Sequence, residues 1–433
     1  MNPISAVTTA KTALAASRAR YVVLTLGFLV AGITYLDRVC ISAAAPSITR
    51  ELGLTDVQMG YVFSAFALAY GIFEIPMGWW GDRIGQRKAL TRIVACWSAF
   101  TALTGLARSF SALITTRLLF GAAEAGAFPT LTRALARWFP TVELGSVTGV
   151  IWMGARLGGA LAPPLSAMLI LRYGWRATFI IFGAVGLVWC VGFWLWFRDD
   201  PAEHPAVNQA ELEHIQGSRA PRAERGGAPA VPWKRLFTDS NLWALFGMYF
   251  TSAYGFWFFL TWLPTYLIRE HGLTLDRSGW YSALPLTAGA AACLVGGMLS
   301  DWLVRRTGSV VWGRRAVGFG AFALGALGFG AAALATTPVA AIVCLTLAQG
   351  ALDLALPVAW ATCLSIGGRY GGTATGFMNT ASSISAVLSP ISAAWLVEIY
   401  GSFRAMFVVS FVVYVIGALL WLKIDPRRSI DPA

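Results

Sequence analysis

Charged residues are scarce in this chain. Asp, Glu, Lys and Arg make up 12% of its 433 residues, whereas soluble domains carry roughly 25%. Hydrophobic residues make up 57%, and the mean hydropathy is +0.63. So little charge argues against a soluble domain and predicts a protein of the lipid bilayer.

Histidine and cysteine are also rare, with three and six copies. The histidines all lie outside the apolar stretches. No two cysteines have the spacing of metal ligands, so we interpret them as small residues of helix packing. They stand at positions 40, 96, 190, 293, 344 and 363. Nucleophile and phosphate-loop motifs are missing as well. We therefore expect no metal site, no cofactor and no enzymatic activity.

Long apolar runs, by contrast, are abundant. Twelve stretches are long enough, or nearly so, to cross a bilayer, which takes about 20 residues each. They are 21–44, 57–80, 89–107, 111–134, 144–171, 177–197, 240–268, 280–300, 316–335, 338–362, 373–398 and 403–423. Because lipid offers the backbone no hydrogen bonds, these repeated spans predict an all-α integral membrane bundle.

The basic residues predict how the spans are oriented. With a cytoplasmic N-terminus, 23 of the 33 Lys and Arg residues fall on the cytoplasmic side or at its helix ends, as the positive-inside rule requires. An even number of spans then places both termini inside. The net charge of +12 follows mostly from this topology, and basic residues scattered over short loops do not favour nucleic-acid binding.

The basic start of the chain resembles a signal peptide, but Asp37 and Arg38 interrupt it, so we expect no cleavage.

The chain divides into two similar halves. Its longest polar interruption separates six spans from six and predicts a linker with a short amphipathic helix near 208–216. Gly78–Lys88, after the second span, is matched by Gly297–Arg306 after the eighth. Two parallel six-helix repeats are typical of transporters whose site lies between the halves. The predicted segments are a cytoplasmic tail (1–20), a first bundle (21–197), a cytoplasmic linker (198–238), a second bundle (239–423) and a cytoplasmic tail (424–433).

Four charged residues lie well inside the first and fourth spans, where each costs at least roughly 2.5–3.5 kcal/mol on insertion scales. They are Asp37, Arg38, Arg117 and Glu124. Arg117 and Glu124 are two helical turns apart on nearly the same face, so each should meet a partner from another helix. Carboxyl groups in apolar surroundings can take up a proton, and arginine binds carboxylates bidentately. The alternative is a purely structural network in which Asp37 binds Arg117.

Several of these segments resemble a known family. Gly78–Lys88 resembles the inter-helix loop motif of the major facilitator superfamily. Tyr35–Arg38, Arg117–Pro129 and Gly376–Asn379 resemble the anion/cation symporter family within it, which includes bacterial sugar-acid permeases. The resemblance implies the major facilitator fold, with twelve transmembrane helices in two six-helix pseudo-repeats. It also implies a monomer in the bacterial inner membrane.

The resemblance further implies roles for single residues. It makes Asp37 and Glu124 proton carriers, and Arg38 or Arg117 a ligand of the substrate carboxylate. It also supports Asn379, a polar amide inside an apolar helix, as a ligand of sugar hydroxyl groups. Tyr35, Tyr70 and Trp360 are further candidates for such contacts, with plain packing as the alternative for each.

A third arginine, Arg156, interrupts the Gly-rich fifth span. It would raise the positive potential of a cavity and suit a second anionic group. Alternatively, it neutralises Glu74 or Asp353, the other acids inside spans. Glu74 lies near the cytoplasmic end of its span, which favours a role in gating or packing over substrate binding.

The loop segments at the cytoplasmic face predict a conformational role. Glycines let helices approach closely, and charge pairs at this face would have to break when it opens. The alternative is plain positive-inside anchoring. The candidate gating residues are Gly78, Asp82, Arg83, Gly85, Arg87, Asp301 and Arg305.

These observations predict a secondary transporter that imports a small organic anion together with protons. Hexonates, hexuronates and aldarates are the leading substrate candidates. One alternative is an aromatic or dicarboxylic acid permease, in which Arg156 holds the second carboxylate. An alternative of another class is a membrane sensor built on a transporter scaffold.

Overall fold

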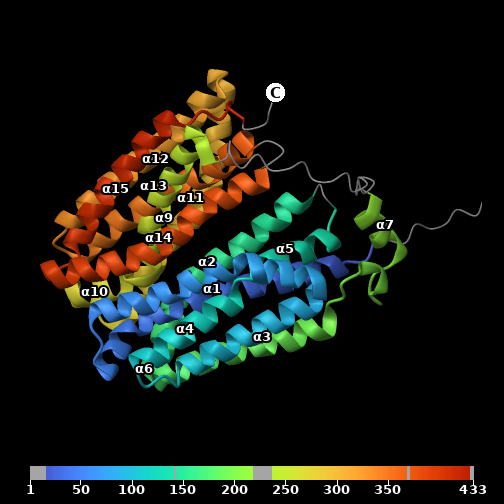
Figure 1. Ribbon diagram of the computed structural model, residues 1–433, viewed down its shortest axis with the longest axis horizontal. Helices are drawn as coiled ribbons and strands as arrows, with labels where there is room; N and C mark the ends of the chain where they lie inside the picture. Colours follow the sequence, from blue (N-terminus) through green and yellow to red (C-terminus); the bar gives the residue numbers. More distant parts are fainter. Residues whose placement is uncertain (1–15, 141–142, 218–236, 368–370, 430–433) are drawn as a thin grey trace, which may run out of the picture.

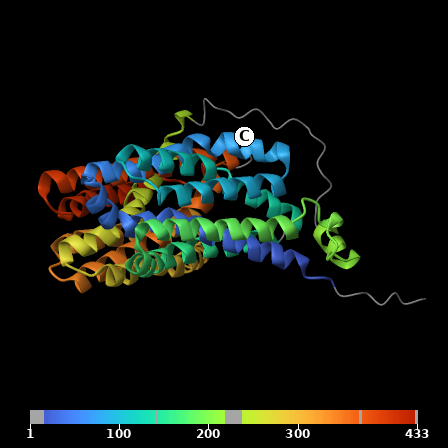
Figure 2. The same ribbon diagram turned by 90° about the horizontal axis from the view of Figure 1, so that it is seen from below.

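The computed structural model describes residues 16–140, 143–217, 237–367 and 371–429. Within these ranges the chain is almost entirely helical and contains no strand. The transmembrane part comprises α1 (Ala19–Leu52), α2 (Asp56–Ile84), α3 (Gln86–Thr104), α4 (Phe110–Glu124), α5 (Ala127–Trp138), α6 (Leu144–Trp196), α9 (Ser240–Thr261), α10 (Leu263–His271), α11 (Leu275–Thr307), α12 (Val310–Leu334), α13 (Pro338–Gly367), α14 (Gly371–Tyr400) and α15 (Arg404–Lys423). Figures 1 and 2 show them running roughly parallel. The chain is a multi-pass membrane protein.

The twelve predicted stretches are mainly helical in the described residues, although helix boundaries differ in three places. Within the described residues, seven helices are long and apolar enough to cross a membrane. α6 contains two predicted spans, 144–171 and 177–197, because Gly174 (φ 80°, ψ 162°) reverses the chain within it. Only glycine adopts this positive φ readily.

Two other predicted spans are each divided into two helices. The stretch 111–134 breaks at Ala125–Gly126, between α4 and α5, and the stretch 240–268 breaks at Trp262, between α9 and α10. Proline lies in the first turn after each break, at Pro129 and Pro264. The first turn tolerates proline because its N–H groups have no partner within the helix.

The helices form two bundles, α1–α6 and α9–α15, which Figure 1 shows converging at the end where α10 lies and separating toward the other end. Contacts join α2 to α14 and α6 to α11. The Ser64 hydroxyl donates a hydrogen bond to the Val387 carbonyl oxygen over 2.7 Å. Arg269 donates to Asp56 over 2.7 Å at the start of α2. These contacts between the bundles lie between the middle of the molecule and the end marked by α10.

Close packing fixes α1 against α6, two of the helices that carry the charged residues discussed below. A Cβ atom added to Gly158 would lie 2.2 Å from the carbonyl oxygen of Gly32. No side chain fits into that space, so the two backbones touch as in small-residue membrane interfaces.

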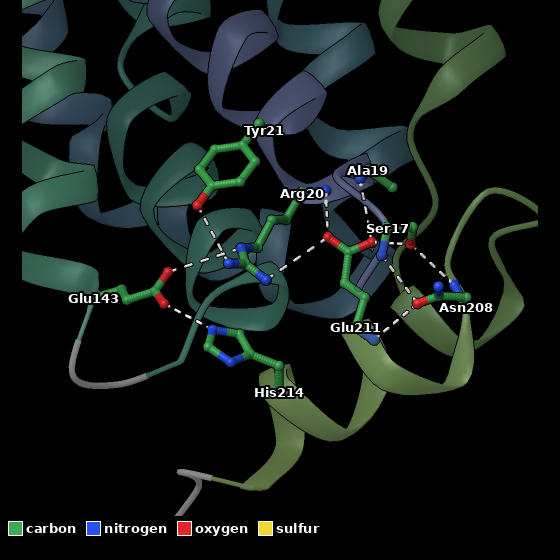
Figure 3. A network of polar contacts seen from close by, with 8 residues as sticks. All are labelled: Ser17, Ala19, Arg20, Tyr21, Glu143, Asn208, Glu211 and His214. Atoms are coloured by element: carbon green, nitrogen blue, oxygen red, sulfur yellow. Dashed lines mark hydrogen bonds and ion pairs between the residues drawn. The ribbon is translucent and has the colours of Figure 1, made fainter. Parts of the chain in front are cut away.

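A short helix, α7 (Gln209–Gly217), lies in the predicted linker within one residue of the expected bounds. Its Glu211 is fully buried, and Figure 3 shows the Glu211 carboxylate at the start of α1. The Glu211 carboxylate accepts hydrogen bonds from the backbone N–H groups of Ala19 and Arg20, both over 3.2 Å, and from the Ser17 hydroxyl. These N–H groups have no partner within α1, and a negative charge also suits the positive end of the helix dipole. α7 is therefore bonded to the first bundle.

A second carboxylate extends this network to α6. Glu143, the residue before α6, lies 3.8 Å from the Arg20 guanidinium and 2.8 Å from the His214 ring (Figure 3). The starts of α1 and α6 are thereby connected through α7. The remainder of the predicted linker, 218–236, lies outside the described residues.

Glu211→Gln is expected to destabilise the protein by about 1–2 kcal/mol, because the amide keeps an acceptor oxygen but loses the charge at the helix terminus. The readout is the Tm of the purified protein. Glu213→Gln serves as the control, since Glu213 is exposed on the same helix and, in the described part of the chain, only accepts a hydrogen bond from Gln209 of α7. Equal Tm values for the two variants would contradict the assigned role of Glu211.

Candidate functional site: a buried charge cluster between α1 and α4

The structure brings the four predicted charges together inside the first bundle. Asp37 and Arg38 project from the middle of α1, and Arg117 and Glu124 from α4. Asp37 and Glu124 are 0% exposed, and Arg117 is 2% exposed. Glu124 is the last residue of α4, directly before the break at Ala125–Gly126. The helix break therefore places its carboxylate where a charge from α1 can reach it.

Arg38 and Glu124 form an ion pair in which Arg38 Nε donates to the Glu124 carboxylate. This confirms that Glu124 meets its partner on another helix. The Arg38 guanidinium also lies over aromatic rings from three helices. Its distances to the ring centroids are 4.7 Å for Tyr70, 5.2 Å for Tyr35, 5.2 Å for Phe66 and 5.9 Å for Phe128. Aromatic faces attract cations, and the attraction grows where water is excluded.

Asp37 has a different partner from the one in the structural alternative. Its Oδ2 accepts a hydrogen bond from the Trp97 indole N–H over 3.1 Å, and its Oδ1 has no hydrogen-bond partner. Among the described residues no ion pair joins Asp37 to Arg117. The Arg117 guanidinium instead lies 4.6 Å and 5.2 Å from the ring centroids of Phe120 and Phe66. Asp37 Oδ1 thus has no hydrogen bond, and Arg117 forms no ion pair among the described residues.

Arg156 lies at the boundary between the bundles. Its Nη2 is 3.6 Å from Asp353 Oδ1 on α13, and its guanidinium lies 4.9 Å from the Phe256 ring centroid on α9. Asp353, which is 5% exposed, also accepts a hydrogen bond from Gln349 over 2.8 Å. Of the two acids considered for neutralising Arg156, the structure selects Asp353. Glu74 is half-buried on α2 and forms no ion pair within the described chain.

The other candidate ligands lie on both sides of this boundary. Tyr35 and Tyr70 belong to the aromatic group around Arg38. Trp360 on α13 donates its indole N–H to the Tyr249 hydroxyl of α9 over 3.2 Å. Asn379 is half-buried on α14. Their roles as ligands remain predictions.

Sequence reasoning missed three partners, Trp97, Tyr249 and Gln349. Each is a polar side chain inside an apolar helix, and that is the signal that could have found Gln349. Trp97 and Tyr249 could not be separated from the many aromatic residues that only pack, because the sequence has 57 of them.

The loop motif after α2 makes one tight connection. Gly85 has φ 86°, and a Cβ on it would lie 2.7 Å from an Asp199 carboxylate oxygen. Asp199 accepts a hydrogen bond from the backbone N–H of Arg87 over 2.8 Å and so caps α3. The Arg87 side chain donates to the Trp194 carbonyl oxygen over 3.1 Å instead of pairing with an acid across the face. Gly85 therefore fixes the join between α3 and the end of α6.

The remaining gating candidates stay predictions. Gly78 lies within α2, and Arg83, Asp301 and Arg305 are exposed. The side chain of Asp82 lies outside the described part of the structure. No group of His, Cys, Asp and Glu in the described residues could hold a metal ion.

Comparison with known proteins gives consistent results. A family model for the Major Facilitator Superfamily matches residues 27–390. A probable sulfoacetate transporter of Cupriavidus necator is 38% identical over 414 residues, 96% of either chain. A probable galactarate/D-glucarate transporter of Escherichia coli is 32% identical over 408 residues, 90% of either chain. A D-galactonate transporter of E. coli is 31% identical over 424 residues, 95% of this chain and 97% of its own.

A solved structure shows the same fold. It is that of a bacterial homologue of the human lysosomal transporter Spinster, which is 20% identical, with a TM-score of 0.79 over 96% of this chain and 99% of its own. The two bundles described above are thus the two six-helix halves predicted from the repeats. Both the family match and the fold lead to one conclusion: the chain belongs to the major facilitator superfamily.

Proposed function

We propose that this protein is a proton-coupled secondary transporter that imports a small organic anion, with a sugar acid as the leading class. The observation that carries the proposal is the Arg38–Glu124 ion pair, in which a buried carboxylate occupies the arginine that an anionic substrate would need. The relatives named above, which transport sulfoacetate, galactarate, glucarate or galactonate by name, support an anionic substrate.

The balance of buried charge explains how protons and the anion are coupled. Arginines 38, 117 and 156 face three buried acids, Asp37, Glu124 and Asp353. An unpaired buried charge is strongly unfavourable, so this set is stable only while it is close to neutral. An incoming carboxylate would make the set negative. Protonation of Glu124 or Asp37 restores neutrality and frees an arginine for the substrate.

The arrangement of the bundles supports alternating access. The contacts between them lie toward the end marked by α10, and the opposite end carries α7 (Figure 1). With the N-terminus in the cytoplasm, the bundles separate toward the cytoplasm, which is an inward-facing arrangement. We place the protein in the bacterial inner membrane as a monomer with both termini inside. Rocking of the halves would then expose the charge cluster to either side.

The test uses purified protein in proteoliposomes that are more acidic outside than inside. Labelled galactonate, galactarate and sulfoacetate are supplied separately, without sodium. We expect at least one of them to accumulate, and a protonophore to abolish the accumulation. Accumulation that requires sodium and ignores the protonophore would overturn proton coupling. Absence of both uptake and counterflow for every anion tested would overturn transport of this class and favour the sensor alternative.

A further inference from the structure

The coupling scheme built on Arg38 and Glu124 uses Arg156 only as one charge of the set, although its side chain is just 16% exposed inside a predicted span. Arg156 projects from α6 of the first bundle and reaches into the second, where it meets Asp353 of α13 and Phe256 of α9. An isolated charge in this position would be costly, so residues of this kind usually serve a pathway or a ligand.

The contact between Arg156 and Asp353 leaves hydrogen-bonding capacity unused. The closest pair of atoms is 3.6 Å apart, beyond a hydrogen bond, and the buried Arg156 Nη1 has no hydrogen-bond partner. Asp353 does not depend on Arg156 alone, because Gln349 donates a hydrogen bond of 2.8 Å to its other oxygen. Arg156 can therefore exchange Asp353 for another anion, and the Asp353 carboxylate still keeps its hydrogen bond from Gln349.

One aromatic ring, Tyr35, lies close to both arginine sites. Tyr35 lies 5.2 Å from the Arg38 guanidinium, measured to its ring centroid. The same ring faces α6, since a Cβ on Gly159 would lie 3.4 Å from Tyr35 Cδ1, and Gly159 is three residues after Arg156. An anion held by Arg38 or Arg117 can thus present its far end to Arg156.

We propose that Arg156 forms a second anion subsite, which Asp353 occupies in this structure and which the distal anionic group of a doubly charged substrate takes over. This inference rests on the proposed function and sharpens it. The substrate class becomes short dianions with a carboxylate or sulfonate at each end. A carboxylate bound bidentately would satisfy the donor atoms that Asp353 leaves unpaired.

The experiment compares galactarate with galactonate, two six-carbon sugar acids that differ in one terminal carboxylate. Binding to the purified full-length protein is measured by calorimetry for the wild type, Arg156→Gln and Asp353→Asn. We expect the wild type to bind galactarate more tightly. Arg156→Gln should weaken galactarate binding about tenfold or more, the usual scale for a lost charged contact, and change galactonate binding little. Asp353→Asn removes the competing carboxylate and should strengthen galactarate binding selectively.

The other outcomes separate this inference from the proposed function. If the wild type binds both acids equally, or if Arg156→Gln weakens both by the same factor, the subsite is overturned while transport of sugar acids stands. If Arg156→Gln does not fold, the galactarate affinity of Asp353→Asn provides the test. An unchanged affinity in that variant overturns the proposed subsite. Binding of neither acid by the wild type overturns the sugar-acid function and the subsite with it.

Discussion

Glu124→Gln protein is expected to bind and exchange its substrate but to lose all accumulation against a gradient. The amide resembles the protonated carboxyl group in size and charge, so Arg38 stays free for the anion, yet no proton can be taken up or released at this position. One proton that enters per substrate across a difference of one pH unit supports about tenfold accumulation. The ratio of internal to external substrate should therefore fall from about ten to one.

The measurement is uptake into proteoliposomes under a pH gradient, with counterflow of labelled substrate as the second readout. Glu74→Gln is the matched control, because Glu74 is an acid inside the same bundle that is only half-buried and forms no ion pair in the described chain. It should accumulate substrate as the wild type does. Wild-type accumulation by Glu124→Gln protein would remove Glu124 from the coupling scheme and leave Asp37 as the candidate.

Arg38→Lys is expected to raise the Kd for the anion by tenfold or more, a loss of about 1.4 kcal/mol or more. Lysine keeps the positive charge that Glu124 requires, so the buried acid is not left unpaired and the fold should survive. It loses the planar group that binds a carboxylate through two parallel hydrogen bonds and lies flat on aromatic rings. This makes Arg38→Lys more informative than Arg38→Ala, which would leave Glu124 as an uncompensated buried charge at a cost of about 3–5 kcal/mol.

The binding of galactarate or galactonate to purified protein provides the readout. Arg108→Lys is the control, since Arg108 is exposed in the connection between α3 and α4. If Arg38→Lys binds the anion as tightly as the wild type, Arg38 serves only as the structural partner of Glu124. Arg117, whose guanidinium forms no ion pair among the described residues, would then be the substrate ligand.

The bilayer made much of this fold predictable from sequence. A span must have a minimum length and few charges, so the twelve stretches and the repeat of six could be identified without any knowledge of contacts. The breaks at Ala125–Gly126 and Trp262 were missed because apolar composition continues across them. Only the prolines in the following turns indicated that the helix stops and starts again.

The charged residues could be predicted individually but not paired. Asp37, Arg38, Arg117 and Glu124 were conspicuous because a charge inside a span is costly. Their partners come from helices far away in the chain: Arg38 and Glu124 are 86 residues apart, and Asp37 and Trp97 are 60 residues apart. Helical periodicity says which face a residue occupies, but it does not say which helix covers that face. For the same reason the choice between Glu74 and Asp353 as partner of Arg156 had to come from the structure.

The rings around Arg38 have a consequence for the empty transporter. When Glu124 takes up a proton before any substrate arrives, the guanidinium loses its counter-ion. Tyr35, Phe66, Tyr70 and Phe128 still surround it, and a desolvated cation gains roughly 2 kcal/mol from a well-placed aromatic face. The rings thus stabilise the unpaired Arg38 guanidinium. The protonated, unloaded state of the transporter therefore lasts long enough for an anion to bind.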